Sequence, residues 1–200
     1  MSKYLKIIMV LLITLFVMSN YVFGLSRAFK DNIYNPGKLK PIDSTVKIKV
    51  GEKVPDFILP SVSGDKISLN QFKGKKHVVI SFVPAAWTPV CSDQWPGYNI
   101  VKDIFDKNNA ILLGITVDNI PTLFAWIKQM GNLWFPVLSD FWPHGKVAKM
   151  FGVLRSDGVT ERALFVIDKE GILRYAYVED INKRPDLKIL VTELEKLSGK

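Results

Sequence analysis

The sequence predicts an α/β fold in which a central mixed sheet is flanked by helices. Two segments, His77–Val83 and Ala110–Val117, are almost entirely apolar and rich in β-branched residues, as strands buried on both faces are. A helical pattern follows each of them, and a hairpin at Leu164–Val178 precedes a C-terminal amphipathic helix. The order strand, helix, strand, helix, hairpin, helix indicates a sheet with helices on both faces.

The N-terminal segment, residues 1–28, predicts a signal peptide or a membrane anchor. Two lysines precede Ile7–Met18, a run of twelve apolar or near-apolar residues. Such a run fits the core of an export signal better than a membrane span, which needs about 20 residues. An uncleaved anchor stays open, and its orientation is uncertain because more positive charges follow the run than precede it. We therefore expect an extracytoplasmic protein, either secreted or periplasmic, or one anchored to the membrane.

Residues 29–45 are typical of a linker, because they contain Asn35-Pro36-Gly37 and Pro41. We expect the folded domain to span residues 46–200. Its first element is an expected edge strand at Val46–Val50, where apolar residues alternate with lysine.

A small hairpin is the next expected element, with strands at Phe57–Leu59 and Lys66–Leu69 joined through Gly64-Asp65. The first buried strand should then lead into a helix from about Thr88 to Lys107. Pro96-Gly97 lies inside this helix and should break it, because proline removes a helical hydrogen bond.

The later elements are a helix at Ile120–Gln129 and the C-terminal helix, whose apolar residues recur at helical spacing (Leu187, Leu190, Val191, Leu194 and Leu197). This element order is compatible with a thioredoxin-like fold, although other α/β folds share it.

Charge and composition exclude several functions. The net charge of +8 comes mostly from the first 50 residues, which hold eight Lys and Arg against two Asp. The remaining chain is nearly neutral, the five tryptophans lack interleaved basic residues, and no phosphate-binding glycine motif occurs, so we expect no nucleic acid and no nucleotide. With one cysteine and two histidines, we also expect no disulfide within the chain, no metal and no cofactor.

The one cysteine, Cys91, lies at a predicted helix start. Thr88 is a suitable N-cap and Pro89 a suitable first helical residue, so Cys91 falls in the first turn. Unpaired backbone N–H groups and the positive end of the helix dipole favour a thiolate there. The alternative is an inert buried cysteine, which is the more common role of a lone cysteine.

The residues around Cys91 resemble the peroxiredoxin family. Pro84, Thr88 and Cys91 have the spacing of its proline, threonine and cysteine motif. Three further matches lie in the family's order along the chain: Val54-Pro55-Asp56-Phe57 before this motif, and after it the run 139–145 (SDFWPHG) and the segment that begins at Arg162. The run 139–145 is similar to that of one-cysteine peroxiredoxins of the alkyl hydroperoxide reductase E type, and the resemblance extends from about Val50 to the C-terminus.

The resemblance implies a thioredoxin-like fold and a thiol-dependent peroxidase that reduces hydrogen peroxide or alkyl hydroperoxides. Cys91 would attack the peroxide and become a sulfenic acid. Thr88 would hydrogen-bond the thiolate and orient the peroxide, and Arg162 would stabilise the thiolate and the breaking O–O bond. Pro84 would shield the sulfur from solvent. For Arg162 and Thr88, a surface charge and a plain helix cap are the alternatives.

Related sequences often carry glutamate where this one has Gln94, so a carboxylate bridge to arginine is in doubt. Without a second cysteine, the resemblance implies an external reductant, either a small thiol or a thioredoxin- or glutaredoxin-like protein, and also a homodimer. A peroxide-sensing or thiol-transfer redoxin without sustained turnover, and a non-enzymatic binding module, stay open as alternatives. His144 could line the active-site pocket, contact a dimer partner or lie in a surface loop, and we expect His77 to be structural.

Overall fold

The computed structural model describes residues 27–131 and 133–199 of the chain. They belong to two units, Met1–Asp31 and Asn32–Lys200. The described part of the first unit is helix α2 (Arg27–Asp31). Residues 1–26, which carry most of the predicted export signal or anchor, lie outside the described residues. Within the described part, no helix is long and apolar enough to cross a membrane.

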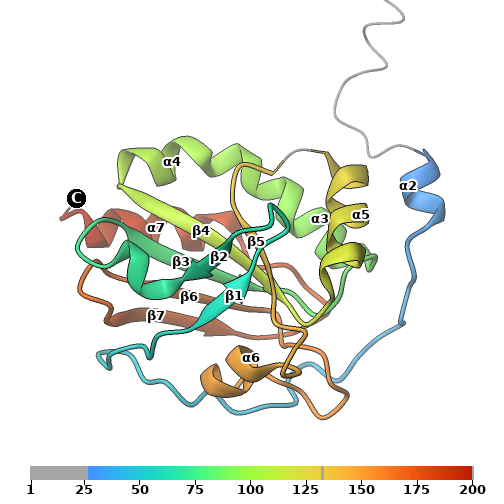
Figure 1. Ribbon diagram of the computed structural model, residues 1–200, viewed down its shortest axis with the longest axis horizontal. Helices are drawn as coiled ribbons and strands as arrows, with labels where there is room; N and C mark the ends of the chain where they lie inside the picture. The colour runs from blue at the N-terminus through green and yellow to red at the C-terminus, as the bar shows by residue number, and fades with distance from the viewer. Residues whose placement is uncertain (1–26, 132, 200) are drawn as a thin grey trace, which may run out of the picture. The chain divides into compact units, whose positions relative to one another are not determined.

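The second unit is built on a five-stranded mixed sheet with the order β5-β4-β3-β6-β7 (Figure 1). Strands β3, β4 and β5 are parallel, whereas β6 is antiparallel to both of its neighbours, β3 and β7. The strands are β3 (His77–Phe82), β4 (Ala110–Thr116), β5 (Val137–Ser139), β6 (Ala163–Ile167) and β7 (Leu173–Val178). The predicted α/β class, mixed sheet and central strands are therefore confirmed.

Helices cover both faces of the sheet, and Figure 1 shows α3 and α4 on one side and α6 on the other. The helices of the domain are α3 (Pro89–Gly97), α4 (Lys102–Lys107), α5 (Ile120–Met130), α6 (Lys146–Phe151) and α7 (Leu187–Leu197), with a 3₁₀ turn η2 (Tyr98–Val101) between α3 and α4. Aromatic rings fill the space beneath α3. Trp95 packs against Trp126 of α5 at 5.1 Å between ring centroids, and a Cβ atom added at Gly114 of β4 would lie 2.9 Å from Trp95. Gly114 thus lets α3 approach the sheet closely.

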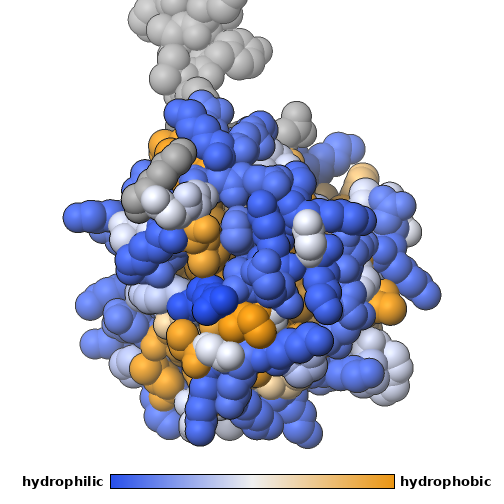
Figure 2. All heavy atoms as spheres, turned by 90° about the vertical axis from the view of Figure 1, so that its left-hand side faces the viewer, coloured by the Kyte–Doolittle hydropathy of each residue, from blue (hydrophilic) through white to orange (hydrophobic). Residues whose placement is uncertain are grey.

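The opposite face of the sheet holds a second apolar cluster. Phe151 of α6 packs against Phe82 and Phe165 at centroid distances of 5.5 and 4.7 Å. The small hairpin β1 (Ile58–Pro60) and β2 (Lys66–Ser68) covers the same cluster through Leu59. Figure 2 shows the outer surface at the left of Figure 1 as largely hydrophilic, with apolar side chains in small groups. The large apolar side chains are mostly inside.

Several expected elements differ from those observed. The helix predicted from Thr88 to Lys107 is interrupted after Gly97, next to the predicted break, where α3 gives way to η2. The edge strand predicted at Val46–Val50 is wrong, because its backbone groups bond to unrelated partners: Lys47 to the carbonyl of Phe151 and Lys49 to a glutamate side chain. Strand β5 and helix α6 were not predicted, since both are short.

His77 at the start of β3 gives a pH-dependent stability. Its side chain is 8% exposed, its Nδ1 has no hydrogen-bond partner among the described residues, and burial lowers its pKa below the ordinary 6.5. Just below pH 6.5 the unfolded chain therefore binds more protons than the folded protein, and stability should rise with pH across that window. We expect Tm to increase from pH 5 to 7, with a smaller slope in His77→Phe. Equal slopes in the two proteins would contradict this account.

Candidate active site

Cys91 lies where β3 leads into α3. Thr88 precedes the helix with extended backbone angles and Pro89 is its first residue, so Cys91 is the third, as predicted. Its side chain is fully buried. The thiol therefore combines the first turn of a helix, where backbone N–H groups are unpaired, with exclusion from bulk water.

The loop before α3 is held in an unusual backbone conformation. Trp87 has a φ of 61°, in the left-handed region that residues other than glycine seldom adopt. The preceding residue is fixed by Asp118, whose carboxylate accepts the backbone N–H of Ala86 at 2.8 Å and the hydroxyl of Thr116 at 2.6 Å. Asp118 follows β4, so the neighbouring parallel strand positions the loop that carries Thr88.

Arg162 brings a positive charge to the sulfur. Its two terminal nitrogens lie 3.6 and 3.5 Å from Sγ of Cys91, and its side chain is 3% exposed. Its other partners are neutral oxygens, Oε1 of Gln94 at 2.6 Å and the carbonyl of Ile181 at 2.9 Å. Among the described residues no carboxylate forms an ion pair with Arg162. The guanidinium therefore places a positive charge directly beside the sulfur, where it stabilises negative charge that develops during a reaction.

Gln94 connects this arginine to a buried network of neutral groups. Its Nε2 donates to the hydroxyl of Tyr98 at 2.7 Å and to that of Ser81 at 3.2 Å, and the indole of Trp95 also donates to Ser81 at 3.3 Å. Burial raises the pKa of Tyr98 to about 12, so the phenol stays neutral at physiological pH. The expected doubt about a carboxylate bridge was justified, because the group that accepts the hydrogen bond from Arg162 is the carboxamide of Gln94. The network described here therefore brings no carboxylate to Arg162.

Thr88, Pro84 and His144 make contacts other than those predicted for a peroxide site. The hydroxyl of Thr88 donates to the carbonyl of Ala85 at 2.9 Å, and it makes no cap hydrogen bond to the helix. Pro84 is buried in the loop between β3 and α3. His144 is exposed and hydrogen-bonds the carbonyl of Gly158 at 2.7 Å, as a surface-loop histidine does. The roles of Thr88 and Pro84 toward the thiolate stay predictions.

Four residues of the site were not predicted from the sequence: Ser81, Tyr98, Asp118 and the carbonyl of Ile181. Ser81 had a signal, because it is the only hydroxyl in the apolar run His77–Val83. Asp118 also ends an apolar strand. Nothing in the sequence pointed to Tyr98 or to the Ile181 carbonyl, because only the fold determines which groups face Gln94 and Arg162.

Replacement of Gln94 by leucine tests the network. The variant leaves a guanidinium nitrogen of Arg162 and the Tyr98 hydroxyl without their partner in a buried site. We expect the free energy of unfolding to fall by about 1–3 kcal/mol, measured by denaturant titration. The matched control is Gln129→Leu at an exposed position of α5, where the change should stay within about 0.5 kcal/mol. Equal stability of the Gln94 variant and the wild-type protein would contradict the network's role.

Comparison with known proteins places these features in context. Residues 50–176 match the model of the AhpC/TSA family. A protein named alkyl hydroperoxide reductase E, from Mycobacterium tuberculosis, is 32% identical over 153 residues, which cover 76% of this chain and 99% of that protein. A chloroplastic 2-Cys peroxiredoxin from Hordeum vulgare is 32% identical over 142 residues, with 66% of this chain and 67% of that protein covered.

The fold is similar to that of a protein whose crystal structure is known. The crystal structure of reduced 2-Cys peroxiredoxin from Plasmodium vivax superposes with a TM-score of 0.72 and 28% identity, covering 76% of this chain and 83% of that chain. The thioredoxin-like prediction is thereby confirmed. Residues before position 50 lie outside the family match, although part of that segment folds against the domain.

Proposed function

The chain belongs to the AhpC/TSA family, and from this premise we propose that Cys91, assisted by Arg162, reduces peroxides in a thiol-dependent peroxidase of the one-cysteine type. The substrates are hydrogen peroxide or alkyl hydroperoxides. The observation that carries the proposal is the buried sulfur of Cys91 within 3.6 Å of an arginine whose other partners are neutral.

The first half-reaction oxidises Cys91. The thiolate attacks one peroxide oxygen, the S–O bond forms and the O–O bond breaks. The second oxygen leaves with the bond's electron pair and is protonated to water or an alcohol, while Cys91 becomes a sulfenic acid. Arg162 stabilises the thiolate before attack and the charge that develops on the departing oxygen. Thr88, at the N-terminus of α3, orients the peroxide, and Pro84 limits access of water to the sulfur.

The second half-reaction restores the thiol. The sequence holds no second cysteine, so an external thiol attacks the sulfenic sulfur, releases water and forms a mixed disulfide with Cys91. A second thiolate then attacks this disulfide and returns the Cys91 thiolate. The reductant is a small thiol or a thioredoxin- or glutaredoxin-like protein. It must reach a sulfur that is fully buried in the reduced form, so the start of α3 has to open after oxidation.

The protein is exported, or anchored with its domain outside the cytoplasm, and it forms a homodimer. The first proposal is supported by the basic and apolar pattern of residues 1–28. The second is supported by exposed aromatic side chains in the loop after β5, where Trp142 is 82% and Phe141 48% exposed.

Turnover separates this function from its alternatives. In stopped-flow mixing of the reduced full chain with hydrogen peroxide, Cys91 should form a sulfenic acid rapidly and in one equivalent. With excess thiol, consumption of peroxide should continue over many equivalents per chain. Consumption that stops at one equivalent would indicate a peroxide sensor or thiol-transfer protein. A Cys91 that does not react with peroxide at all would indicate a binding module.

A further inference from the structure

Residues 32–47, here called the strap, lie before the family match yet are bound to the domain. The backbone N–H of Tyr34 donates to the carbonyl of Trp87 at 2.8 Å, in the loop that leads to Cys91. At the other end, the N–H of Lys47 donates to the carbonyl of Phe151 at 3.0 Å. Between these ends the strap contacts two segments. One accepts a hydrogen bond from Arg162, and the other directly precedes Arg162 in the chain.

The first of these segments is the loop between β7 and α7. The carboxamide of Asn182 accepts the N–H of Leu39 and donates to its carbonyl, both at 2.9 Å. The N–H of Ile181 donates to the carbonyl of Pro41 at 3.0 Å, and the carbonyl of Ile181 accepts Nε of Arg162 at 2.9 Å. Among the described residues, the strap and Arg162 are the only distant hydrogen-bond partners of Ile181 and Asn182.

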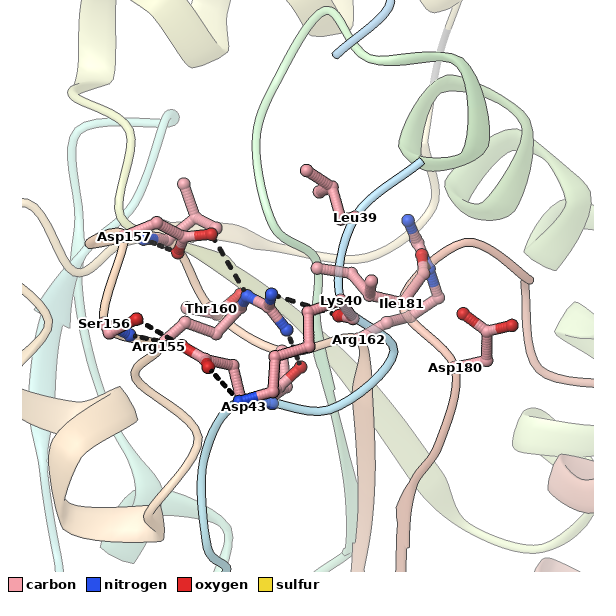
Figure 3. Close-up of polar contacts among 12 residues, drawn as sticks. Leu39, Lys40, Asp43, Arg155, Ser156, Asp157, Thr160, Arg162, Asp180 and Ile181 are labelled. Carbon is pink, nitrogen blue, oxygen red and sulfur yellow. Dashed lines mark hydrogen bonds and ion pairs between the residues drawn. The ribbon is translucent and has the colours of Figure 1, made fainter. Parts of the chain in front are cut away.

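The second segment leads directly into Arg162 along the chain. Oε1 of Glu161 accepts the N–H of Asp43 at 2.6 Å, and its Oε2 accepts Nη1 of Arg155 at 2.8 Å. Arg155 also donates to the carbonyl of Lys40 at 3.1 Å. Figure 3 shows Lys40 of the strap between Arg155 on one side and Ile181 with Arg162 on the other.

We propose that the strap is a positioning element for the reaction at Cys91: it fixes Ile181 and Glu161, and through them the guanidinium of Arg162. Ile181 and Asn182 belong to a loop without sheet or helix hydrogen bonds, so the direction of the Ile181 carbonyl depends on the strap. That carbonyl holds Nε, which leaves both terminal nitrogens of Arg162 directed at the sulfur and Gln94. The inference rests on the proposed function only for its effect on peroxide reduction.

Asn182→Ala tests the strap, because it removes both hydrogen bonds to Leu39, together with a local one to Asp180, without touching Arg162. The matched control is Asn35→Ala, which removes an exposed hydrogen bond to Gly37 within the strap itself. In the full chain, we expect Asn182→Ala to slow oxidation of Cys91 by hydrogen peroxide about tenfold, since small displacements of a reacting group cost up to about a hundredfold. Asn35→Ala should stay within about twofold of the wild type. Equal rates for the two variants would overturn the proposal.

A double variant distinguishes positioning of Arg162 from general loosening of the fold. In an Arg162→Ala background, Asn182→Ala should cause no further loss of rate, because the group that the strap positions is gone. The same tenfold loss in both backgrounds would show a merely structural role. If Asn182→Ala does not fold by circular dichroism, Asp43→Ala tests the other end of the strap. It keeps the backbone bond to Glu161 but removes the carboxylate that accepts the N–H of Ser156 at 2.9 Å and so holds Asp43 in place. An Asp43→Ala variant with the wild-type rate would then count against the proposal.

A second measurement keeps the strap separate from the proposed function. The exchange of the Arg162 Nε proton with solvent can be followed by NMR in the reduced protein, without peroxide. Asn182→Ala should accelerate this exchange, because a displaced Ile181 carbonyl no longer accepts the proton. Faster exchange in a protein that does not react with peroxide would support the strap and reject the peroxidase. Peroxide reactivity with no faster exchange and no slowing of oxidation would do the reverse.

Discussion

Replacement of Cys91 by serine should abolish peroxide reduction while leaving the fold in place. Serine has nearly the same size, but its hydroxyl is not ionised at neutral pH and is a far weaker nucleophile toward an O–O bond. Arg162 cannot compensate, because a nearby cation stabilises an anion that serine does not form. We expect peroxide consumption with excess thiol to fall by at least about 10⁴-fold, the scale of loss when an enzyme is deprived of its nucleophile.

The measurement needs a check on folding, because Cys91 is fully buried. The change of Tm in Cys91→Ser should be small, and Cys91→Ala should be equally inactive although it adds no polar group. Since the sequence has one cysteine, residual consumption above the uncatalysed background in both variants would place the chemistry at another residue. If Cys91→Ser is both inactive and unfolded, the test rests on Cys91→Ala: a thermal scan shows whether it is folded, and its peroxide consumption then decides whether Cys91 is required.

The central strands were predictable because burial on both faces leaves a simple sequence signal. His77–Phe82 is buried at every position, and Ala110–Thr116 at all but one. Strand β5 has only three residues, which is too short for any periodicity, and it is recognisable only by its pairing with β4. The pattern at Val46–Val50 misled for a related reason. Alternation in the sequence does not require a strand: only Ile48 of its three apolar residues is buried, Val50 is exposed, and the segment pairs with no strand.

The site residues that could be predicted from the sequence are likewise those that lie close together in the chain. Thr88, Pro89 and Cys91 are neighbours in sequence, so helix-start chemistry was sufficient to place the thiol in the first turn of α3. Arg162 is 71 residues away and was identified through the family resemblance. The carbonyl of Ile181, which holds Arg162, could not be predicted, because any residue type supplies a carbonyl and only the fold selects one. The same holds for the strap, which composition alone describes as a linker.

Arg162→Ala should slow oxidation of Cys91 by hydrogen peroxide by about 10²–10³-fold, the loss that follows removal of one donor aimed at developing charge. Two losses combine: the thiolate has no buried cation beside it, and the departing oxygen has no donor. Arg162→Lys should fall between, because an ammonium supplies charge but cannot bond Ile181, Gln94 and the sulfur from one planar group.

The matched control is Arg174→Ala. Arg174 is 49% exposed on β7 and pairs with Asp168 rather than with any group of the site, so the rate should be unchanged. Stopped-flow rates at several peroxide concentrations give the second-order constant. Circular dichroism tests whether Arg162→Ala is folded, since the variant leaves the oxygens of Gln94 and Ile181 without their donor. A rate for Arg162→Lys above that of Arg162→Ala would assign the effect to charge. Equal rates for the two variants would assign it to the geometry of the guanidinium. An Arg162→Ala rate within a few-fold of the wild type would remove Arg162 from the mechanism, and with it the function proposed for the strap.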